Sequence, residues 1–138
     1  MAGVSEQEAM IAGSKPMPYF SHDSTAHEDI KCRLLILRGG MEYYGLWWML
    51  CELLAGADNH RLPYETDEHK QLMAIMLQTE PDKASTFIGC CAELGLIDKE
   101  LCERGVIVSD RMLRNSAVFG RNRANGKRGG KKTATAQG

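Results

Sequence analysis

The chain has 138 residues, of which 43% are hydrophobic and 25% are charged, and its formal net charge is −1 at pH 7. This length favours one compact domain with terminal extensions and does not predict a second hydrophobic core. No stretch supplies the roughly 20 consecutive apolar residues of a membrane span, and the N-terminus lacks the continuous apolar run of a secretory signal. We therefore expect a cytoplasmic protein that does not interact with membranes.

Charge is distributed unevenly along the chain. Residues 121–138 hold six lysines and arginines and no acid, a charge of +6, whereas residues 1–120 hold 11 basic and 18 acidic side chains, a charge of −7. An acidic body with a basic end favours contact between that end and a polyanion. A basic end that only keeps the chain soluble is the alternative.

The chain contains five cysteines, and none belongs to a C-x-x-C pair or has a histidine at metal-ligand spacing. Reduced thiols buried in the core are the simplest interpretation, and they fit a cytosolic protein. The sequence therefore predicts no metal site and no cofactor. The cysteines are Cys32, Cys51, Cys90, Cys91 and Cys102.

Residues 1–17 are expected to form a flexible leader, because prolines at its end prevent a helix from continuing. Thr25 and Glu28 then form a capping box, which predicts the start of a helix. Apolar residues recur along this helix at helical spacing, and Gly39 and Gly40 offer a left-handed ending. These apolar residues are Ile30, Leu34, Leu37 and Met41.

The stretch from Gly40 to Ala57 is the expected centre of the core. It contains both tryptophans and two of the four tyrosines, and its apolar residues point nearly all round a helix, which is typical of a buried helix. Base stacking by the pairs Tyr43-Tyr44 and Trp47-Trp48 is the alternative. Adjacent helical residues point about 100° apart, so at most one of each pair can be exposed.

A short edge strand is predicted at Arg61–Tyr64, because proline is tolerated at a sheet edge. Thr66 or Glu65 can cap a third helix that ends near Gln78. Its inner face is expected to consist of Leu72, Ile75 and Met76.

A fourth helix is predicted after Thr79, which can act as its cap, with a proline in the first turn. Gly95 is expected to end this helix. Its inner face is expected to consist of Ala84, Phe87, Ile88, Cys91 and Leu94.

Two runs rich in β-branched residues, 96–98 and 106–108, predict a hairpin with the charged segment Lys99–Gly105 as its loop. A last helix is predicted over residues 110–124. The basic residues 125–138 are expected to be a disordered tail, because they cannot bury enough apolar surface.

The predicted elements follow the order of a winged helix, with helices, one short strand, two helices joined by a tight turn, and a hairpin. The predicted fold class is therefore mainly α with a small β-hairpin (α+β). Residues 18–109 would form the winged helix-turn-helix domain, followed by an extra C-terminal helix and the basic tail.

No catalytic arrangement is recognisable in the sequence. The sequence shows no nucleophile paired with a base, no pair of carboxylates, no phosphate-binding glycine loop and no metal cluster. His22-Asp23 joins a histidine to an acid, but sequence neighbours seldom form a catalytic pair, so packing against Tyr19 and Phe20 is the favoured interpretation. We expect a protein without enzymatic activity.

In a winged helix the fourth helix would occupy the recognition position and the following loop the wing. The candidate DNA contacts there are Lys83, Ser85 and Thr86 on the helix and Lys99 and Arg104 in the wing. One lysine among acids is a poor phosphate contact, because affinity for duplex DNA comes from neutralising several phosphates at once.

The C-terminal segment is the better electrostatic candidate, since it can follow a phosphate backbone without reading sequence, with an affinity that falls steeply with salt. Its candidate DNA-binding residues are Arg111, Arg114, Arg121, Arg123, Lys127, Arg128, Lys131 and Lys132.

Six segments together carry a family resemblance: Tyr19–Asp23, Asp29-x-Lys31, Gly40–Leu54, Leu62-Pro63, Glu93–Ile97 and Gly126–Lys132. They resemble the N-terminal domain of phage and prophage replisome organisers, which is similar to the DnaD N-terminal domain. The spacing Gly-x-x-x-Tyr-Gly-x-x-Trp at residues 40–48 is the most specific part, and the resemblance covers about residues 18–132. Tyr43 stands where this family usually has a glycine.

The resemblance implies a non-catalytic winged-helix protein that binds origin DNA in the initiation of phage or prophage replication. The implied partners are DNA and replication proteins such as a helicase or helicase loader, and the related DnaD domain implies a homo-oligomer. Many such proteins continue into a longer C-terminal region, whereas few residues follow the basic segment here. Two alternatives are an oligomerisation module of a replication-initiation complex and a winged-helix transcriptional regulator.

Overall fold

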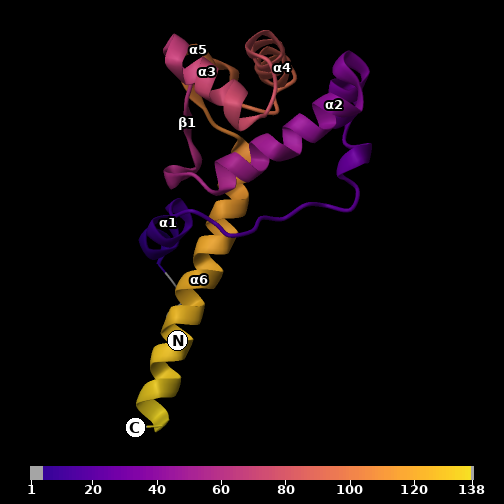
Figure 1. Cartoon of the computed structure of the whole chain (residues 1–138). Helices are drawn as coiled ribbons and strands as arrows, with labels where there is room; N and C mark the ends of the chain where they lie inside the picture. The colour runs from indigo at the N-terminus through magenta and orange to yellow at the C-terminus, as the bar shows by residue number, and fades with distance from the viewer. Residues whose placement is uncertain (1–4, 138) are drawn as a thin grey trace.

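The structure, a computed structural model, describes the backbone of residues 5–137 and the side chains of residues 5–125. It is mainly helical with a small two-stranded antiparallel sheet, which confirms the predicted α+β class. Figure 1 shows α2 to α5 forming a body, while α6 runs away from this body with α1 beside it. The elements are α1 (Glu6–Ser14), η1 (Ala26–Glu28), α2 (Ile30–Ala55), η2 (Asp58–His60), β1 (Leu62–Pro63), α3 (Asp67–Met76), α4 (Pro81–Glu93), α5 (Lys99–Glu103), β2 (Val106–Ile107) and α6 (Asp110–Gln137).

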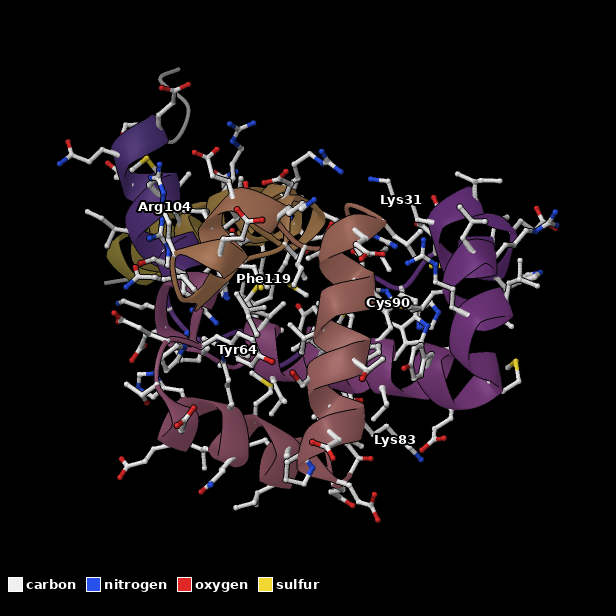
Figure 2. The ribbon with its side chains drawn as sticks, turned by 90° about the horizontal axis from the view of Figure 1, so that it is seen from above. Lys31, Tyr64, Lys83, Cys90, Arg104 and Phe119 are labelled. Atoms are coloured by element: carbon white, nitrogen blue, oxygen red, sulfur yellow. The ribbon has the colours of Figure 1, made fainter. Side chains whose placement is uncertain are left out.

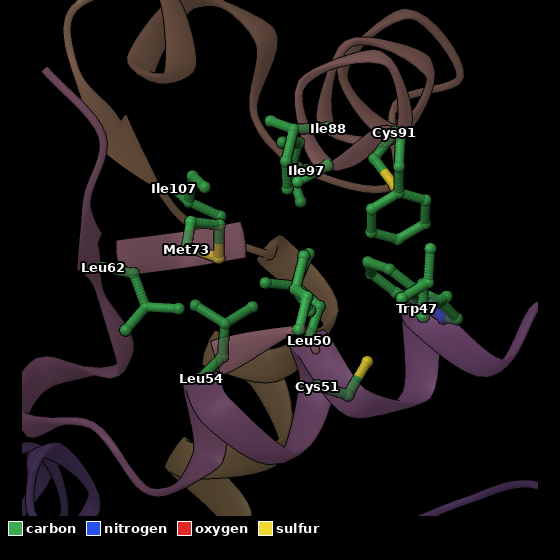
Figure 3. Packing of buried hydrophobic residues seen from close by; sticks show 14 of the residues in the cluster. Trp47, Leu50, Cys51, Leu54, Leu62, Met73, Ile88, Cys91, Ile97 and Ile107 are labelled. Carbon is green, nitrogen blue, oxygen red and sulfur yellow. The ribbon is translucent and has the colours of Figure 1, made fainter. Parts of the chain in front are cut away.

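The hydrophobic core lies between the second half of α2 and the elements α3, α4 and β2. Trp47 and Leu50 of α2 are buried together with Met73 of α3, Phe87 of α4 and Ile107 of β2. Figure 3 shows the labelled side chains of this cluster pointing into the space between the elements that carry them. The stretch from 40 to 57 is therefore the centre of the core, as predicted.

The start of α2 differs from the prediction. Thr25 precedes the short 3₁₀ helix η1 and makes no capping hydrogen bond with its side chain, so the predicted capping box was wrong. Asp29 caps α2 instead, and its Oδ1 accepts hydrogen bonds from the backbone N–H groups of Lys31 and Cys32. Asp29 directly precedes the helix in an extended conformation, which is the geometry an N-cap requires.

Two segments of α2 meet at Gly40, whose φ of 73° and ψ of −168° are not helical. Glycine adopts a positive φ without the penalty that a side chain imposes. A side chain at Gly39 would also collide with the ring of Tyr43. The predicted left-handed ending is thus a kink between two helical segments, and the second segment follows at once.

Four apolar residues of the first α2 segment and the kink are exposed to solvent. Ile30, Leu34, Leu37 and Met41 have exposed fractions between 39% and 81%, whereas Leu35 on the opposite side of the helix is fully buried. We call these four residues the α2 stripe. Their helical spacing reflects a solvent-facing apolar surface rather than a core face.

The predicted cap of α3 is correct, whereas the predicted cap of α4, Thr79, is wrong. Thr66 forms a capping box with His69 at the start of α3, and Pro81 occupies the first turn of α4, with Glu80 rather than Thr79 as its cap. Gly95 follows α4 with a φ of 76°, as expected for a left-handed ending.

The predicted inner face is correct for most of α4 and mostly wrong for α3. Ala84, Phe87, Ile88 and Cys91 are buried. In α3 the fully buried residues are Met73 and Ala74; of the predicted face, Met76 is partly buried against the core, while Leu72 and Ile75 are exposed. The predicted face and the buried face of α3 differ by a rotation of about one residue, or 100°. Apolar residues lie on both faces, so the sequence pattern did not distinguish them.

The predicted hairpin is not formed in the described structure. β2 pairs with β1 in antiparallel register, with Leu62 opposite Ile107. Residues 96–98 form no strand, and their contact with residues 106–108 is the hydrogen bond from Asp98 N to Val108 O at 2.8 Å. The expected wing loop is the helix α5, capped by the Asp98 side chain, which accepts from Leu101 N at 2.9 Å. An N-cap followed by helix-forming residues outweighs the hairpin pattern here.

Helix α1 forms within the expected leader, because the Ser5 side chain caps it by accepting from Glu8 N at 3.1 Å. It lies against α6 through small residues, with Ala9 and Gly13 facing Ser116 and Gly120. A side chain on Gly120 would collide with the backbone of Ala9 and Gly13. The two helices therefore pack backbone to backbone.

The buried His60 ties α1 to the end of α2. Its Nδ1 lies 3.0 Å from the carbonyl oxygen of Leu54, and its Nε2 contacts the carbonyl oxygen of Gly13. These two carbonyls stand at or next to the C-terminal ends of α2 and α1, where few backbone acceptors have a helical partner. The N-terminal helix is thus anchored to the body as well as to α6.

Helix α6 starts at Asp110, where the sequence predicted a helix, and continues to Gln137. The prediction ended this helix at residue 124 and began a disordered tail at 125. No proline occurs after Pro81, and alanine, lysine and arginine favour helix, so the sequence holds no strong break at residue 124.

Candidate nucleic-acid interface

On α4, the helix in the predicted recognition position, the lysine is already paired. Lys83 Nζ lies 2.9 Å from Oε1 and 3.2 Å from Oε2 of Glu42 on α2, and this hydrogen-bonded ion pair raises the pKa of Lys83. Ser85 and Thr86 are exposed, and the Thr86 hydroxyl donates to the carbonyl oxygen of Asp82 at 2.9 Å. The N-terminal part of α4 therefore offers little unpaired positive charge to phosphates.

The two wing candidates lie on α5. Arg104 Nη2 forms an ion pair of 2.9 Å with Glu100 Oε1 one turn earlier, and Lys99 is exposed in the first turn. Figure 2 shows Lys83 and Arg104 far apart in the view, near different parts of the body. The structure does not bring the recognition-helix and wing candidates together into one basic cluster.

A further ion pair joins α2 to α4. Arg38 Nη1 lies 2.6 Å from Glu93 Oε2 and 3.7 Å from Cys90 Sγ, and the hydrogen bonds to Cys90 and Glu93 raise the pKa of Arg38. Figure 2 shows Cys90 between these two helices. Together with the Lys83–Glu42 pair, this ion pair neutralises the basic side chains at the interface of α2 and α4.

Arg111, at the start of α6, is held by the body. Its Nη2 lies 3.2 Å from Asp23 Oδ2, and its guanidinium stands 5.7 Å from the ring centre of Trp48. His22 stacks on the same tryptophan, with ring centres 3.4 Å apart, and Phe20 lies beside it. His22-Asp23 therefore serves packing in this region, and Arg111 is partly neutralised by the neighbouring acid.

Arg114 and Arg121 lie on the exposed surface of α6, and neither forms an ion pair or hydrogen bond with any other described side chain. Arg123 is half-buried, with its guanidinium 4.6 Å from the ring centre of Phe119 and hydrogen bonds to the carbonyl oxygens of Ala12 and Pro16. Unpaired cations thus occur on α6 more than on α4 or α5. The side chains of Lys127, Arg128, Lys131 and Lys132 lie outside the described residues.

Two grooves flank α6. One, with a volume of about 530 Å³, lies between α6 and the segment Met17–Ser21 and contains Tyr19, Phe119 and Arg123. The other, about 580 Å³, lies between α1, η2 and α6 and contains Arg61 and Arg121. Sequence reasoning missed Arg61 and the groove at Tyr19, because both depend on how α1 and its following segment lie on α6.

No cysteine is paired in a disulfide. Burial raises the pKa of Cys51 to about 12 and that of Cys91 well above its ordinary value, and it also raises the pKa of Cys32 and Cys102. All five cysteines are free. Within residues 5–125, no three histidine, cysteine or acidic side chains come together as a metal site.

The model of the Lin1244/Lin1753-like N-terminal family matches residues 19–112, which is more than half of the chain. The chain belongs to this family. The match agrees with the phage or prophage type of family that the sequence resembles. No curated protein and no solved structure matches the chain.

The Lin1244/Lin1753-like match covers the body and ends at Met112, in the first turn of α6. Helix α1 and the part of α6 that carries Arg114, Arg121 and Arg123 lie outside the matched region. Among the described residues, no helix combines the length and the apolar character that a membrane span requires.

Proposed function

We propose that this protein is a non-catalytic, DNA-associated module that acts in phage or prophage replication initiation and contacts the DNA backbone through α6. The observation that carries the proposal is the charge of α6. Between Arg111 and Lys132 its sequence contains eight basic residues and no acid, and the helix projects from the body (Figure 1). Such a helix neutralises several phosphates at once without reading bases.

The arrangement of the body supports a winged-helix type of module. A tight turn joins α3 to α4, and the strand after α4 pairs with β1, which precedes α3. Helix α5 stands where a wing loop is expected. Because Lys83 is paired with Glu42, we assign the main phosphate contacts to α6 rather than to α4.

The replication role and the protein partners rest on the family resemblance. A phage or prophage replisome organiser works beside a helicase or helicase loader, and the acidic body, with a sequence charge of −7 over residues 1–120, provides a surface distinct from the basic helix. In this proposal α6 binds DNA and the body contacts the partner proteins.

Replacing Arg114 and Arg121 together by glutamine is expected to weaken binding to duplex DNA and to make it less dependent on salt. Each phosphate contact contributes about −0.9 to the slope of log K against log salt concentration, so the slope should become shallower by about 2. Neither side chain has a partner among the described residues, so the fold should be unaffected. Fluorescence anisotropy across a salt series measures the slope.

Lys83→Gln provides the matched control, since it removes a charge that Glu42 already neutralises. We expect its salt slope to stay within the error of the unmodified chain. A larger change for Lys83→Gln than for the double variant would assign the phosphate contacts to α4 and would contradict the assignment to α6.

Self-association is a second candidate function, and the α2 stripe favours it. On the first helical segment of α2 its residues Ile30, Leu34 and Leu37 are separated by four and three positions, which is the spacing of a coiled-coil seam, and Met41 lies just beyond the kink. The same segment of a second copy presents the same three residues, so two copies can bury them against each other. A surface that is complementary to itself in this way is what a two-fold dimer requires.

One positive charge, Lys31, lies beside the stripe on the same helical segment. Lys31 donates to the neutral carbonyl oxygen of Gly95 at 3.2 Å and has no acidic partner among the described residues. The seam is short, so we propose a weak, concentration-dependent dimer.

Leu37→Lys should convert this dimer into a monomer at all concentrations, because it places two charges in an apolar seam. Leu37 is 81% exposed, so the substitution should leave the fold intact. Sedimentation equilibrium over a concentration series measures the result. The matched control is Ile75→Lys on the exposed side of α3, which should dimerise normally; equal behaviour of both variants would argue against the α2 stripe.

A further inference from the structure

The groove between α6 and Met17–Ser21 combines an open aromatic ring, amide groups and positive charge. Its volume of about 530 Å³ falls within the range of roughly 300–1,000 Å³ that small-ligand sites occupy. One wall is the segment that leads from α1 towards η1, and the other is a face of α6. The segment is held by the hydrogen bond from Met17 N to the carbonyl oxygen of Ala55 in α2, at 2.8 Å, and by Arg123 of α6, which donates to the carbonyl oxygen of Pro16.

Tyr19 supplies the open ring. It meets Phe119 edge to face, with ring centres 5.2 Å apart and an interplanar angle of 78°, and 69% of the tyrosine is exposed. An edge-to-face contact covers at most one face of a ring. A flat ligand can therefore stack on Tyr19 without displacing Phe119, whose ring is also held by Arg123.

Asn115 and Asn122 supply the amides. They are seven residues apart on α6 and line the groove with Phe119, since positions separated by two helical turns share a face. Neither amide forms a hydrogen bond with another described residue. Asparagine amides offer both a donor and an acceptor, which suits the edge of a nucleobase.

Charge identifies the class of ligand. Arg123 lines the groove, and residues 111–125 of α6 contain no acid, which favours an anionic ligand. Arg111, one turn before Asn115, is paired with Asp23. A stacking ring inside a basic groove is the arrangement that proteins use for single-stranded nucleic acid.

We propose that this groove binds an unpaired base of single-stranded DNA, which stacks on Tyr19 while its edge faces Asn115 and Asn122 and its phosphates lie near Arg123. The inference deepens the proposed function and rests on the same basic helix. A protein that contacts the sugar-phosphate backbone of duplex DNA and also binds an unpaired base beside it would bind partly opened DNA more tightly than closed duplex.

The test compares Tyr19→Ala and Tyr19→Phe with the unmodified full-length chain, using fluorescently labelled oligo-dT and a labelled duplex of equal length. We expect Tyr19→Ala to weaken binding to oligo-dT about tenfold, because stacking on one aromatic ring accounts for an effect of this size. Binding to the duplex should stay within about twofold, and Tyr19→Phe should bind oligo-dT like the unmodified chain, since it keeps the ring.

Salt dependence separates stacking from a general loss of charge. Tyr19→Ala should lower the affinity for oligo-dT without changing the slope against salt, because the number of phosphate contacts is unchanged. An equal loss on both DNAs, or no loss on oligo-dT, would overturn the inference. If the unmodified chain binds duplex DNA but not oligo-dT, base binding in the groove is contradicted and the proposed function is not. If it binds neither DNA, both are contradicted.

Discussion

Trp47→Ala is expected to lower the free energy of unfolding by about 3–5 kcal/mol, which is the usual effect of removing a large aromatic side chain from a core. Trp47 is 1% exposed and lies in the cluster formed by α2, α3, α4 and β2. A domain of this size has about 5–15 kcal/mol of stability in total. The variant should therefore unfold at a much lower urea concentration, as measured by far-ultraviolet circular dichroism.

Two controls make this result specific. Ile75→Ala removes an apolar side chain that is 71% exposed, and it should change the stability by no more than about 0.5 kcal/mol. Trp47→Phe keeps an aromatic ring and removes an indole N–H that has no hydrogen-bond partner among the described atoms. It should therefore lower the free energy of unfolding by less than Trp47→Ala does. A loss below about 1 kcal/mol for Trp47→Ala would contradict the position of Trp47 in the core.

Gly120→Ala is expected to displace α1 from α6. The new methyl group would collide with the backbone of Ala9 and Gly13, which cannot move away as a flexible side chain can. Overpacking of this kind typically costs about 1–3 kcal/mol. We expect the amides of α1 to lose their protection against hydrogen exchange, while those of α4 in the body keep theirs.

The same substitution elsewhere should have the opposite effect. Gly89 lies on the exposed side of α4, and a methyl group there would meet no atom within 4 Å. Gly89→Ala should stabilise the chain by about 0.4–1 kcal/mol, because alanine has fewer unfolded conformations to lose than glycine. Full protection of α1 in the Gly120→Ala variant would show that the two helices do not pack backbone to backbone.

Several elements with strong local signals were predicted well. Thr66 as a cap of α3, the proline at the start of α4 and the glycine after α4 are local features, and the helices begin and end near them. The core helix was also recognisable, because apolar residues surround it on nearly every side.

The errors arose where tertiary contacts decide between local alternatives. Residues 96–98 and 106–108 have a hairpin pattern, but β2 pairs with β1 and Asp98 caps a helix instead. The apolar spacing of the α2 stripe is helical whether the stripe faces the core or solvent, so periodicity alone could not reveal its exposure.

Of the candidate site, only its positive charge could be predicted from the sequence. The basic composition of the C-terminal segment is visible in the sequence, whereas the pairing of Lys83 with Glu42 depends on the packing of α4 against α2. The groove at Tyr19 depends on how the segment Met17–Ser21 lies against α6, which no local sequence pattern predicts. The docking of α1 on α6 was not predictable either, because Ala9 and Gly13 form no apolar stripe. Small residues at a close helix contact leave a weak hydrophobic signal.

The most direct test of the central claim is a titration of the unmodified chain into labelled duplex DNA between about 50 and 200 mM salt. Contact through the arginines of α6 predicts binding at the lower salt and an affinity that falls steeply as salt rises. The slope of log K against log salt should correspond to several phosphate contacts at about 0.9 each. Absence of binding at the lower salt, or an affinity that does not change with salt, would contradict the account.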